Sequence, residues 1–341
     1  MRIEGIWVPS LPPLTGRISG SKGTMKDAAA HIADIEKSLK AEIPEGVTAV
    51  AAVSGGIDST VAAVLANRVI GTRVRPLFVD TGLLRQDEGP KVLGSVRKAG
   101  IPLELIDARQ TFFRALKGVI DPEEKRTRIG EAFIRVFEQE AKSNGATHLI
   151  QGTIAPDWIE SGGGMRDTIK KHHNVGGLPK DMRLKVVEPL RDLYKDEVRA
   201  IAKHLGVPEA SRQPFPGPGL AVRVLGEVTE ERVATLRAAT VVVEEAVERA
   251  VGQGKIHSPW QYFAVLLPIQ STGVIGDNRT YANTVAVRMV ESSDAMSATA
   301  SEPPAWLLRE ISERITRELS GKVNRVVYDV TDKPPATIEW E

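Results

Sequence analysis

Residues 49–66 read AVAAVSGGIDSTVAAVLA, an apolar run that is interrupted by Ser54, Gly55 and Gly56 and then resumes at helical spacing. The near-continuous apolar residues before the break are typical of a strand that is buried on both faces of a sheet. Two adjacent residues without a Cβ allow a tight turn directly after that strand. The stretch therefore predicts a β-strand, a close turn and an α-helix.

The same alternation of strand and helix continues along the first part of the chain. Such alternation is typical of a parallel sheet with crossover helices, so we predict an α/β, doubly wound parallel sheet for residues 25–211. Residues 1–24 contain Pro, Gly and Ser and are expected to form a loose lead-in. The expected strands are 47–53, 73–79, 102–107, 146–152 and 184–189, and the expected helices are 25–42, 58–70, 88–99, 129–144 and 194–205.

A change of composition at 207–219, VPEASRQPFPGPG, predicts a boundary between two structural units. Beyond it we expect a smaller α+β domain over 212–341. Its expected helices are 228–252 and 304–320, and its expected strands are 261–267, 282–290, 323–330 and 336–340.

Composition limits the possible functions. The 341 residues are 42% hydrophobic and carry a net charge of +1, so no overall field attracts nucleic acid or a membrane surface. No apolar run approaches the roughly 20 residues of a membrane helix, and we expect a cytoplasmic protein. The absence of cysteine excludes a disulfide framework, a thiolate metal site and a cysteine nucleophile.

The turn after the first strand has the features of a phosphate-binding site. The first N–H groups of a helix lack intrahelical partners and carry the positive end of its dipole, which favours an anion. The spacing matches neither the Walker loop nor the GxGxxG dinucleotide motif. The alternative is an ordinary strand-to-helix turn with Asp58 near its N-cap. The candidate phosphate-binding residues are Ser54, Gly55, Gly56, Ile57, Asp58, Ser59 and Thr60.

Residues 161–183, SGGGMRDTIKKHHNVGGLPKDMR, predict a glycine-rich lid with a cationic centre. Lys170, Lys171, His172 and His173 would give this lid an anionic target. A solvated surface loop is the alternative, and no further ligand is spaced to complete a metal site at the two histidines, so any metal ligands stay unknown. Asp157 and Glu160 precede the lid and share a face only if their segment is helical; otherwise they belong to a solvated turn.

SGGIDST resembles the pyrophosphate-binding motif of the N-type ATP pyrophosphatases, and seven further stretches resemble the GMP synthetases within that family. In chain order they are VDTGLLR (79–85), QGTIAPDWIES (151–161), IKKHHNVGGLP (169–179), EPLRDLYKDEVR (188–199), RQPFPGPGLAVRVLGE (212–227), GDNRTY (276–281) and NRVVYDVTDKPPATIEWE (324–341). The resemblance implies a ligase that uses ATP and Mg²⁺ to adenylate XMP on its C2 oxygen, after which ammonia attacks C2 and gives GMP and AMP. It also implies an adenine-nucleotide alpha-hydrolase-like sheet at 25–211 and a dimerisation and XMP-binding domain at 212–341.

The resemblance also assigns roles to residues. It implies that residues 54–60 bind ATP, that the lid side chains at 170–173 act in catalysis together with Asp157 and Glu160, and that XMP has four ligands. Lys171 and Gln213 depart from the family pattern, which has a small polar residue and a histidine at those positions. The implied XMP ligands are Arg85, Asp277, Lys333 and Glu339.

The source of ammonia follows from the missing cysteine. Glutamine amidotransferase domains use a cysteine thiolate, so this chain is expected to receive ammonia from a separate glutaminase subunit. The resemblance of the second unit to the family's dimerisation domain implies a homodimer, since closed two-fold symmetry is the commonest arrangement. Two alternatives stay open: another N-type ATP pyrophosphatase such as NAD synthetase, and a non-catalytic nucleotide-binding subunit.

Overall fold

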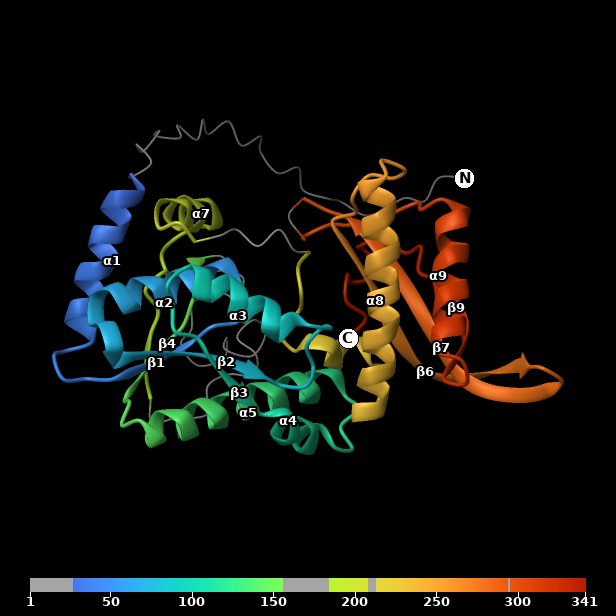
Figure 1. The fold of residues 1–341 in the computed structure, drawn as a ribbon, viewed down its shortest axis with the longest axis horizontal. Helices are drawn as coiled ribbons and strands as arrows, with labels where there is room; N and C mark the ends of the chain where they lie inside the picture. Colours follow the sequence, from blue (N-terminus) through green and yellow to red (C-terminus); the bar gives the residue numbers. More distant parts are fainter. Residues whose placement is uncertain (1–26, 156–183, 208–212, 294) are drawn as a thin grey trace, which may run out of the picture.

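The computed structural model describes residues 27–155, 184–207, 213–293 and 295–341 (Figure 1). The predicted lead-in at 1–24, the predicted lid at 161–183 with its four basic side chains, and the carboxylates Asp157 and Glu160 lie outside the described residues. None of the helices in the described ranges combines the length and the apolar character that crossing a bilayer requires.

Five parallel strands form the first sheet, as the alternating pattern predicted. They are β1 (Ala49–Ala52), β2 (Val74–Asp80), β3 (Glu104–Asp107), β4 (His148–Ile150) and β5 (Lys185–Val187). Their order is β3-β2-β1-β4-β5. The chain builds outward from β1 in one direction and then returns to its other side with β4. This reversal makes the gap between β1 and β4 the topological switch point, where ligands of such sheets bind beyond the carboxyl ends of the strands.

Helices cover both faces of this sheet, which makes the fold doubly wound. The alternating side chains of β1 show it: Ala49 and Ala51 pack with one set of helices, whereas Val50 packs with the other. The first set is α1 (Ala28–Glu42), α2 (Ile57–Ile70), α3 (Glu88–Lys98) and α7 (Lys195–His204). The second set is α4 (Arg109–Leu116) and α5 (Pro122–Ser143).

The helices on the second face differ from the prediction in two ways. The helix expected at 129–144 begins at Pro122, where Asp121 caps it by accepting a 2.8 Å hydrogen bond from the backbone N–H of Glu124. Proline at the first helical position and an Asp cap are a strong start signal. The helix α4 was not predicted, because its eight residues are too few to show a helical period clearly.

The second unit is a smaller mixed sheet with two helices against one face. The helices are α8 (Glu230–Gly252) and α9 (Ala305–Glu318), and the strands are β6 (Gln261–Ile275), β7 (Asn278–Glu291), β8 (Thr299–Ala300) and β9 (Val323–Tyr328). The strands β6 and β7 form a long antiparallel hairpin, and β9 pairs with β7 in parallel. The far end of this hairpin projects away from the rest of the molecule (Figure 1).

The predicted strand at 336–340 is wrong, although the segment is firmly packed. The carbonyl oxygens of Thr337 and Ile338 accept hydrogen bonds of 2.9 Å from the buried Arg288 guanidinium instead of pairing with a neighbouring strand. Ile338 packs against Phe263 and Val265 on the face of the sheet that the helices leave free.

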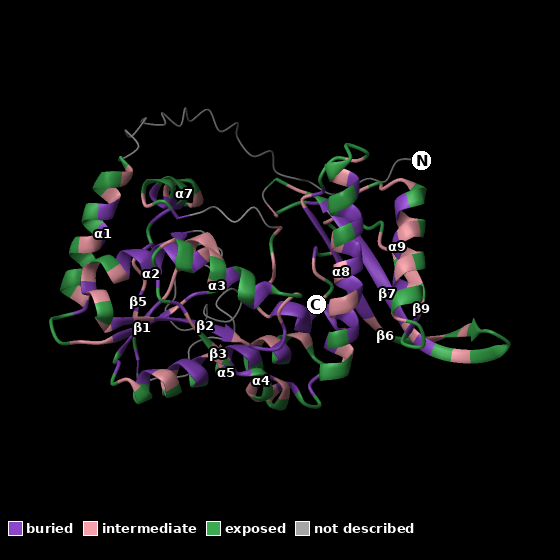
Figure 2. Cartoon of the chain, viewed as in Figure 1, coloured by how far each residue is buried: buried purple, intermediate pink, exposed green. Residues whose placement is uncertain are grey.

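One hydrophobic core continues through both units. It includes Val50 and Leu77 of the parallel sheet, Leu220 of the connecting 3-10 helix η2 (Gly219–Arg223), and Leu236 and Val285 of the second unit. In Figure 2 the buried residues accordingly run from the first sheet to α8 and β7, and the last residue lies between the two units.

Candidate active site

The turn between β1 and α2 lies at the switch point of the sheet. Its shape depends on Gly55, which has a φ of +79°. A Cβ at this position would lie 2.4 Å from Cγ2 of the buried Val92 on α3. Only glycine therefore fits, both because the backbone is left-handed and because α3 packs against the turn.

Hydroxyl groups hold the turn in shape. The Ser59 Oγ accepts from the Ser54 backbone N–H at 3.1 Å and lies 3.0 Å from the Ser54 Oγ. Ser59 and Thr60 donate to the Gly56 carbonyl at 3.1 and 2.9 Å. Ser59 and Thr60 are buried, so these two predicted ATP-binding residues stabilise the turn. Ser54, in contrast, is exposed.

Asp58 has one paired oxygen and one unpaired oxygen. Its Oδ2 lies 2.6 Å from the Nζ of Lys195, the first residue of α7. Its Oδ1 is buried and has no hydrogen-bond partner among the described residues, and the same holds for Oε1 of Gln151 at the end of β4. Buried polar atoms normally have hydrogen-bond partners, so a ligand bound beside the switch point would satisfy these two acceptors.

Gly152, the second residue after β4, sets the distance between the end of β4 and the start of α2. A Cβ here would lie 2.5 Å from the Ser59 backbone nitrogen and 2.6 Å from its Cα. The motif QGTIAPDWIES thus contributes a close backbone contact to the turn, which the sequence analysis did not identify.

A second cluster lies where the two units meet. Arg85, which follows β2, contacts Glu244 Oε1 at 3.3 Å and Glu88 Oε1 at 3.4 Å. Its guanidinium lies 4.7 Å from the ring centroid of Phe215. Burial raises the pKa of Glu244, while the charge of Arg85 opposes that shift.

The cluster continues to the C-terminal tail through Arg223. This fully buried residue makes a bidentate ion pair with Glu339, at 2.8 and 2.7 Å. It lies 3.9 Å from the Phe263 centroid and 5.4 Å from that of Phe215, the ring that also contacts Arg85. Arg85 and Glu339, both predicted ligands of one substrate, therefore belong to a single connected network.

Gln213 also belongs to this network. Its Nε2 donates to Glu244 Oε1 at 3.0 Å, and its Oε1 accepts from the Tyr262 backbone N–H at 2.8 Å. The residue at this position therefore ties the proline-rich segment to α8 and β6.

The other two predicted ligands of that substrate have no hydrogen bond or ion pair to this network among the described residues. Lys333 is in the tail, and its Nζ donates to the Ala295 carbonyl at 2.8 Å. Asp277 occupies the turn between β6 and β7, at the projecting end of the hairpin (Figure 1). One copy of the chain does not bring Asp277 to Arg85 and Glu339.

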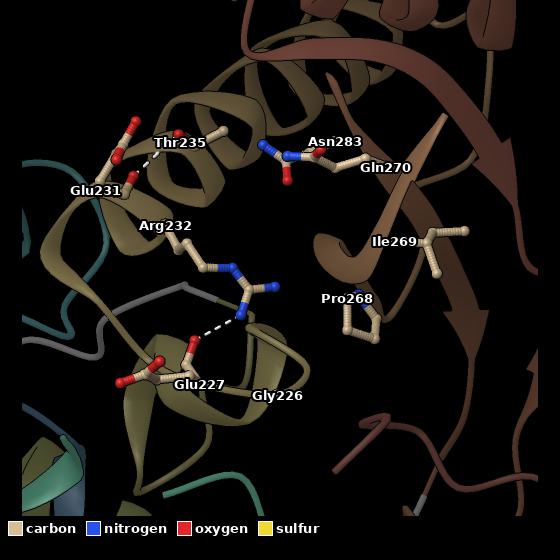
Figure 3. A pocket seen from close by; sticks show the side chains of 9 residues that line it. All are labelled: Gly226, Glu227, Glu231, Arg232, Thr235, Pro268, Ile269, Gln270 and Asn283. Carbon is tan, nitrogen blue, oxygen red and sulfur yellow. Dashed lines mark hydrogen bonds between the residues drawn. The ribbon is translucent and has the colours of Figure 1, made fainter. Parts of the chain in front are cut away.

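A hollow of about 440 Å³ beside the start of α8 is unrelated to these two clusters (Figure 3). Arg232 points into it, but its guanidinium donates to the carbonyls of Glu227 at 2.5 Å and Leu225 at 2.9 Å. A smaller hollow of about 360 Å³ adjoins the turn at residues 54–60, called the phosphate turn after its predicted ligand, and is lined by Ile57 of α2 and by Arg199 and Lys203 of α7.

The described residues include no group of three or more His, Cys, Asp or Glu side chains that could hold a metal ion by themselves. Sequence reasoning missed three residues that the geometry makes prominent: Lys195 beside Asp58, and Arg223 and Glu244 in the second cluster. Lys195 and Arg223 lie within stretches that were singled out, whereas Glu244 lies in the helix predicted at 228–252; only their partners across the fold reveal all three.

Comparison with known proteins gives a consistent picture. A family model described as the GMP synthase C terminal domain matches residues 248–340. A GMP synthase (glutamine-hydrolyzing) subunit of Thermoplasma volcanium is 54% identical over 319 residues, which are 93% of this chain and 100% of that protein. The corresponding subunit of Thermococcus kodakarensis is 56% identical over 90% of this chain and 98% of that protein. The GMP synthase (glutamine-hydrolyzing) of Aeropyrum pernix is 53% identical over 91% of this chain but 60% of its own length.

Proposed function

The chain belongs to the GMP synthase (glutamine-hydrolyzing) family, as its ATP-pyrophosphatase synthetase subunit, and from this premise we propose that it makes GMP from XMP, ATP and ammonia. In the first step the C2 oxygen of XMP attacks the α-phosphorus of ATP, and pyrophosphate leaves. In the second step ammonia attacks C2, and AMP leaves with the bonding electron pair. The observation that carries the proposal is the turn at residues 54–60, placed at the switch point of a parallel sheet.

The turn would bind the phosphates that become pyrophosphate. The N-terminal end of α2 presents backbone N–H groups and a partial positive charge to them. Lys195 adds a cation next to Asp58. Such groups stabilise negative charge most where it develops, which for this reaction is on the leaving pyrophosphate.

Asp58 fits a role in holding Mg²⁺ together with ATP. A bare carboxylate would repel phosphate, but its buried Oδ1, without a partner among the described residues, is the kind of hard oxygen ligand that Mg²⁺ prefers. The cation would neutralise phosphate charge. Phosphate-bound Mg²⁺ needs only one or two protein carboxylates, which agrees with the lack of a larger acidic cluster in the described ranges.

XMP would bind between the turn and the C-terminal tail. Arg85 is suited to an anionic oxygen, and Glu339, held by Arg223, can accept hydrogen bonds from ring N–H or ribose hydroxyl groups. Lys170, Lys171, His172, His173, Asp157 and Glu160 stay proposed catalytic residues from the resemblance alone.

A role for Asp277 requires a second copy of the chain, because its hairpin projects away from the tail of its own copy (Figure 1). We therefore retain the homodimer as part of the proposal. The exposed apolar side chains Val274 and Tyr281 on the same hairpin support this view.

Ammonia would come from a separate glutaminase subunit. The chain has no cysteine, and the Aeropyrum relative extends beyond the 60% that this chain matches, which leaves room for a further domain in that protein. The chain alone should thus use ammonium salts but not glutamine.

The test is pyrophosphate release by the purified chain with ATP and Mg²⁺. We expect release that depends on XMP, and GMP formation that depends on added ammonium at alkaline pH and is absent with glutamine. Deamido-NAD in place of XMP is the control for a related ligase. Failure of XMP to elicit pyrophosphate would contradict the proposal and favour a non-catalytic nucleotide-binding role.

A further inference from the structure

Lys125 is a fully buried cation that joins the two units of the chain. It is the fourth residue of α5, a helix of the parallel-sheet unit, and its Nζ forms an ion pair with Oε2 of Glu341. The two residues are 216 positions apart in the sequence. The ion pair therefore ties the end of the C-terminal tail, residues 331–341, to the unit that carries the phosphate turn.

The ammonium group has a complete set of acceptors. Besides Glu341, it donates to the Val224 carbonyl at 2.8 Å and contacts the Ala221 carbonyl at 3.5 Å. The second oxygen of Glu341 accepts from the Gly226 backbone N–H at 3.2 Å. The Glu341 carboxylate thus bridges α5 and the segment that connects the two units.

Burial lowers the pKa of Lys125, and the Glu341 carboxylate opposes that shift. An isolated ammonium at this depth would be costly, so its charge depends on the partner. Buried ion pairs contribute little net stability compared with apolar packing, and the best-supported reason to keep one is that it selects a single arrangement. Here the arrangement selected is the position of the tail.

Lys125 differs from the other cations that hold the tail. The described residues contain three buried Lys or Arg side chains, namely Lys125, Arg223 and Arg288, and all three contact the tail. Arg288 belongs to β7 and Arg223 to η2. Among these three, only Lys125 comes from a helix that packs on the parallel sheet.

The geometry of the tail transmits this anchor to the substrate-binding residues. Glu339 precedes Glu341 by two positions and is fixed by Arg223. The residue before Glu339, Ile338, packs against the second sheet. The section from Ile338 to Glu341 is thus fixed at both ends, one in each unit, and Glu339 lies between them.

We propose that Lys125 is a positioning residue for XMP, whose ion pair with Glu341 fixes Glu339 relative to the phosphate turn. This inference rests on the proposed function, because it takes Glu339 as a ligand of XMP. Lys125 does not touch the substrate. Its loss should weaken XMP binding while ATP binding stays intact.

The experiment compares Lys125→Met, Glu341→Ala and the double variant with the wild-type chain. Methionine replaces the lysine side chain as far as Cε and lacks the ammonium group, and Glu341→Ala tests the same pair from its other partner in case Lys125→Met fails to fold. The matched control is Arg128→Met, which removes an exposed pair with Glu124 on the same helix. The readouts are KM for XMP and for ATP in the ammonium-dependent reaction, the calorimetric Kd for ATP, and hydrogen exchange of residues 331–341.

We expect each single variant to raise KM for XMP about tenfold, equivalent to about 1.4 kcal/mol. The double variant should show no larger effect, because both substitutions break one contact. KM and Kd for ATP should stay within twofold of wild type, exchange of the tail should rise, and Arg128→Met should change none of these values.

Glu341→Gln supplies the conservative variant. Its amide oxygen can still accept from Lys125, so it should restore most of the XMP affinity that Glu341→Ala loses. A merely structural role would instead lower the activity with both substrates in parallel with stability.

An unchanged KM for XMP in an active, folded Glu341→Ala variant would overturn the inference and leave the proposed function standing. Equal losses for XMP and ATP would overturn it too. A wild-type chain that releases no pyrophosphate with XMP would instead refute the proposed function, and with it the role of the Lys125–Glu341 pair in XMP binding. In that case hydrogen exchange would still show whether the pair holds the tail.

Discussion

Replacing Gly152 by alanine should damage ATP binding by displacing the backbone at the start of α2. The added Cβ would lie 2.5, 2.6 and 2.8 Å from backbone atoms of Ser59 and Asp58. Normal carbon contacts need about 3.5 Å, so the start of α2 must move by about 1 Å. Overpacking of this kind costs about 1–3 kcal/mol of folding free energy, and a shift of about 1 Å in a catalytic arrangement can cost about 100-fold in rate.

The assay is the calorimetric Kd for ATP together with pyrophosphate release, beside urea unfolding of the same samples. We expect Kd to rise at least tenfold and the rate to fall about 100-fold, with a folded protein. Gly94→Ala is the matched control, because nothing lies within 4 Å of its added Cβ. That variant lies within α3 and should gain up to about 1 kcal/mol of stability. Wild-type ATP affinity in Gly152→Ala would refute the claim that β4 sets the position of the turn.

Two further predictions concern Glu244 and the hairpin. Because burial raises the pKa of Glu244, the folded state retains this proton longer than the unfolded state, and stability should fall as pH rises from the ordinary pKa of 4.5 through the raised value. Glu244→Gln should remove that fall, which urea unfolding of both proteins across this pH range would measure. If the free energy of unfolding depends on pH equally in wild type and Glu244→Gln, the assignment to Glu244 is wrong. Val274→Arg, at an exposed apolar site on β6, should shift the chain from dimer to monomer in analytical ultracentrifugation, whereas a dimer that withstands the substitution would exclude this face from the interface.

The elements that the sequence predicted best are those whose signal is local and repeated. The strands β1 and β2 are apolar runs of the parallel sheet, and α2 follows its strand at once, so their order and type could be predicted. The short helix α4 lacked enough turns to show a period. The segment 336–340 was predicted as a strand, but Arg288 binds the carbonyl groups of Thr337 and Ile338, so they do not pair with a neighbouring strand.

Individual site residues were harder to predict than the site itself. The two glycines of the turn look equivalent in the sequence, yet a Cβ at Gly56 would meet only the Ser54 Oγ at 3.4 Å, whereas one at Gly55 would collide with Val92. The pairs Asp58–Lys195 and Arg223–Glu339 span 137 and 116 positions, and no local pattern marks either. Such pairings depend on the packing of whole elements, which composition and periodicity do not specify.

The buried cations that contact the tail make its detachment from the rest of the chain costly. A segment that is attached only by apolar contacts leaves a partly exposed apolar surface when it detaches, at a cost that scales with area. Detachment of residues 331–341 would also remove acceptors from Lys125, Arg223 and Arg288, the buried cations of the described ranges. Uncompensated buried charges cost far more than the ion pairs contribute when intact. The tail should therefore detach only together with wider opening of the second unit, which keeps Glu339 in place whether or not substrate is bound.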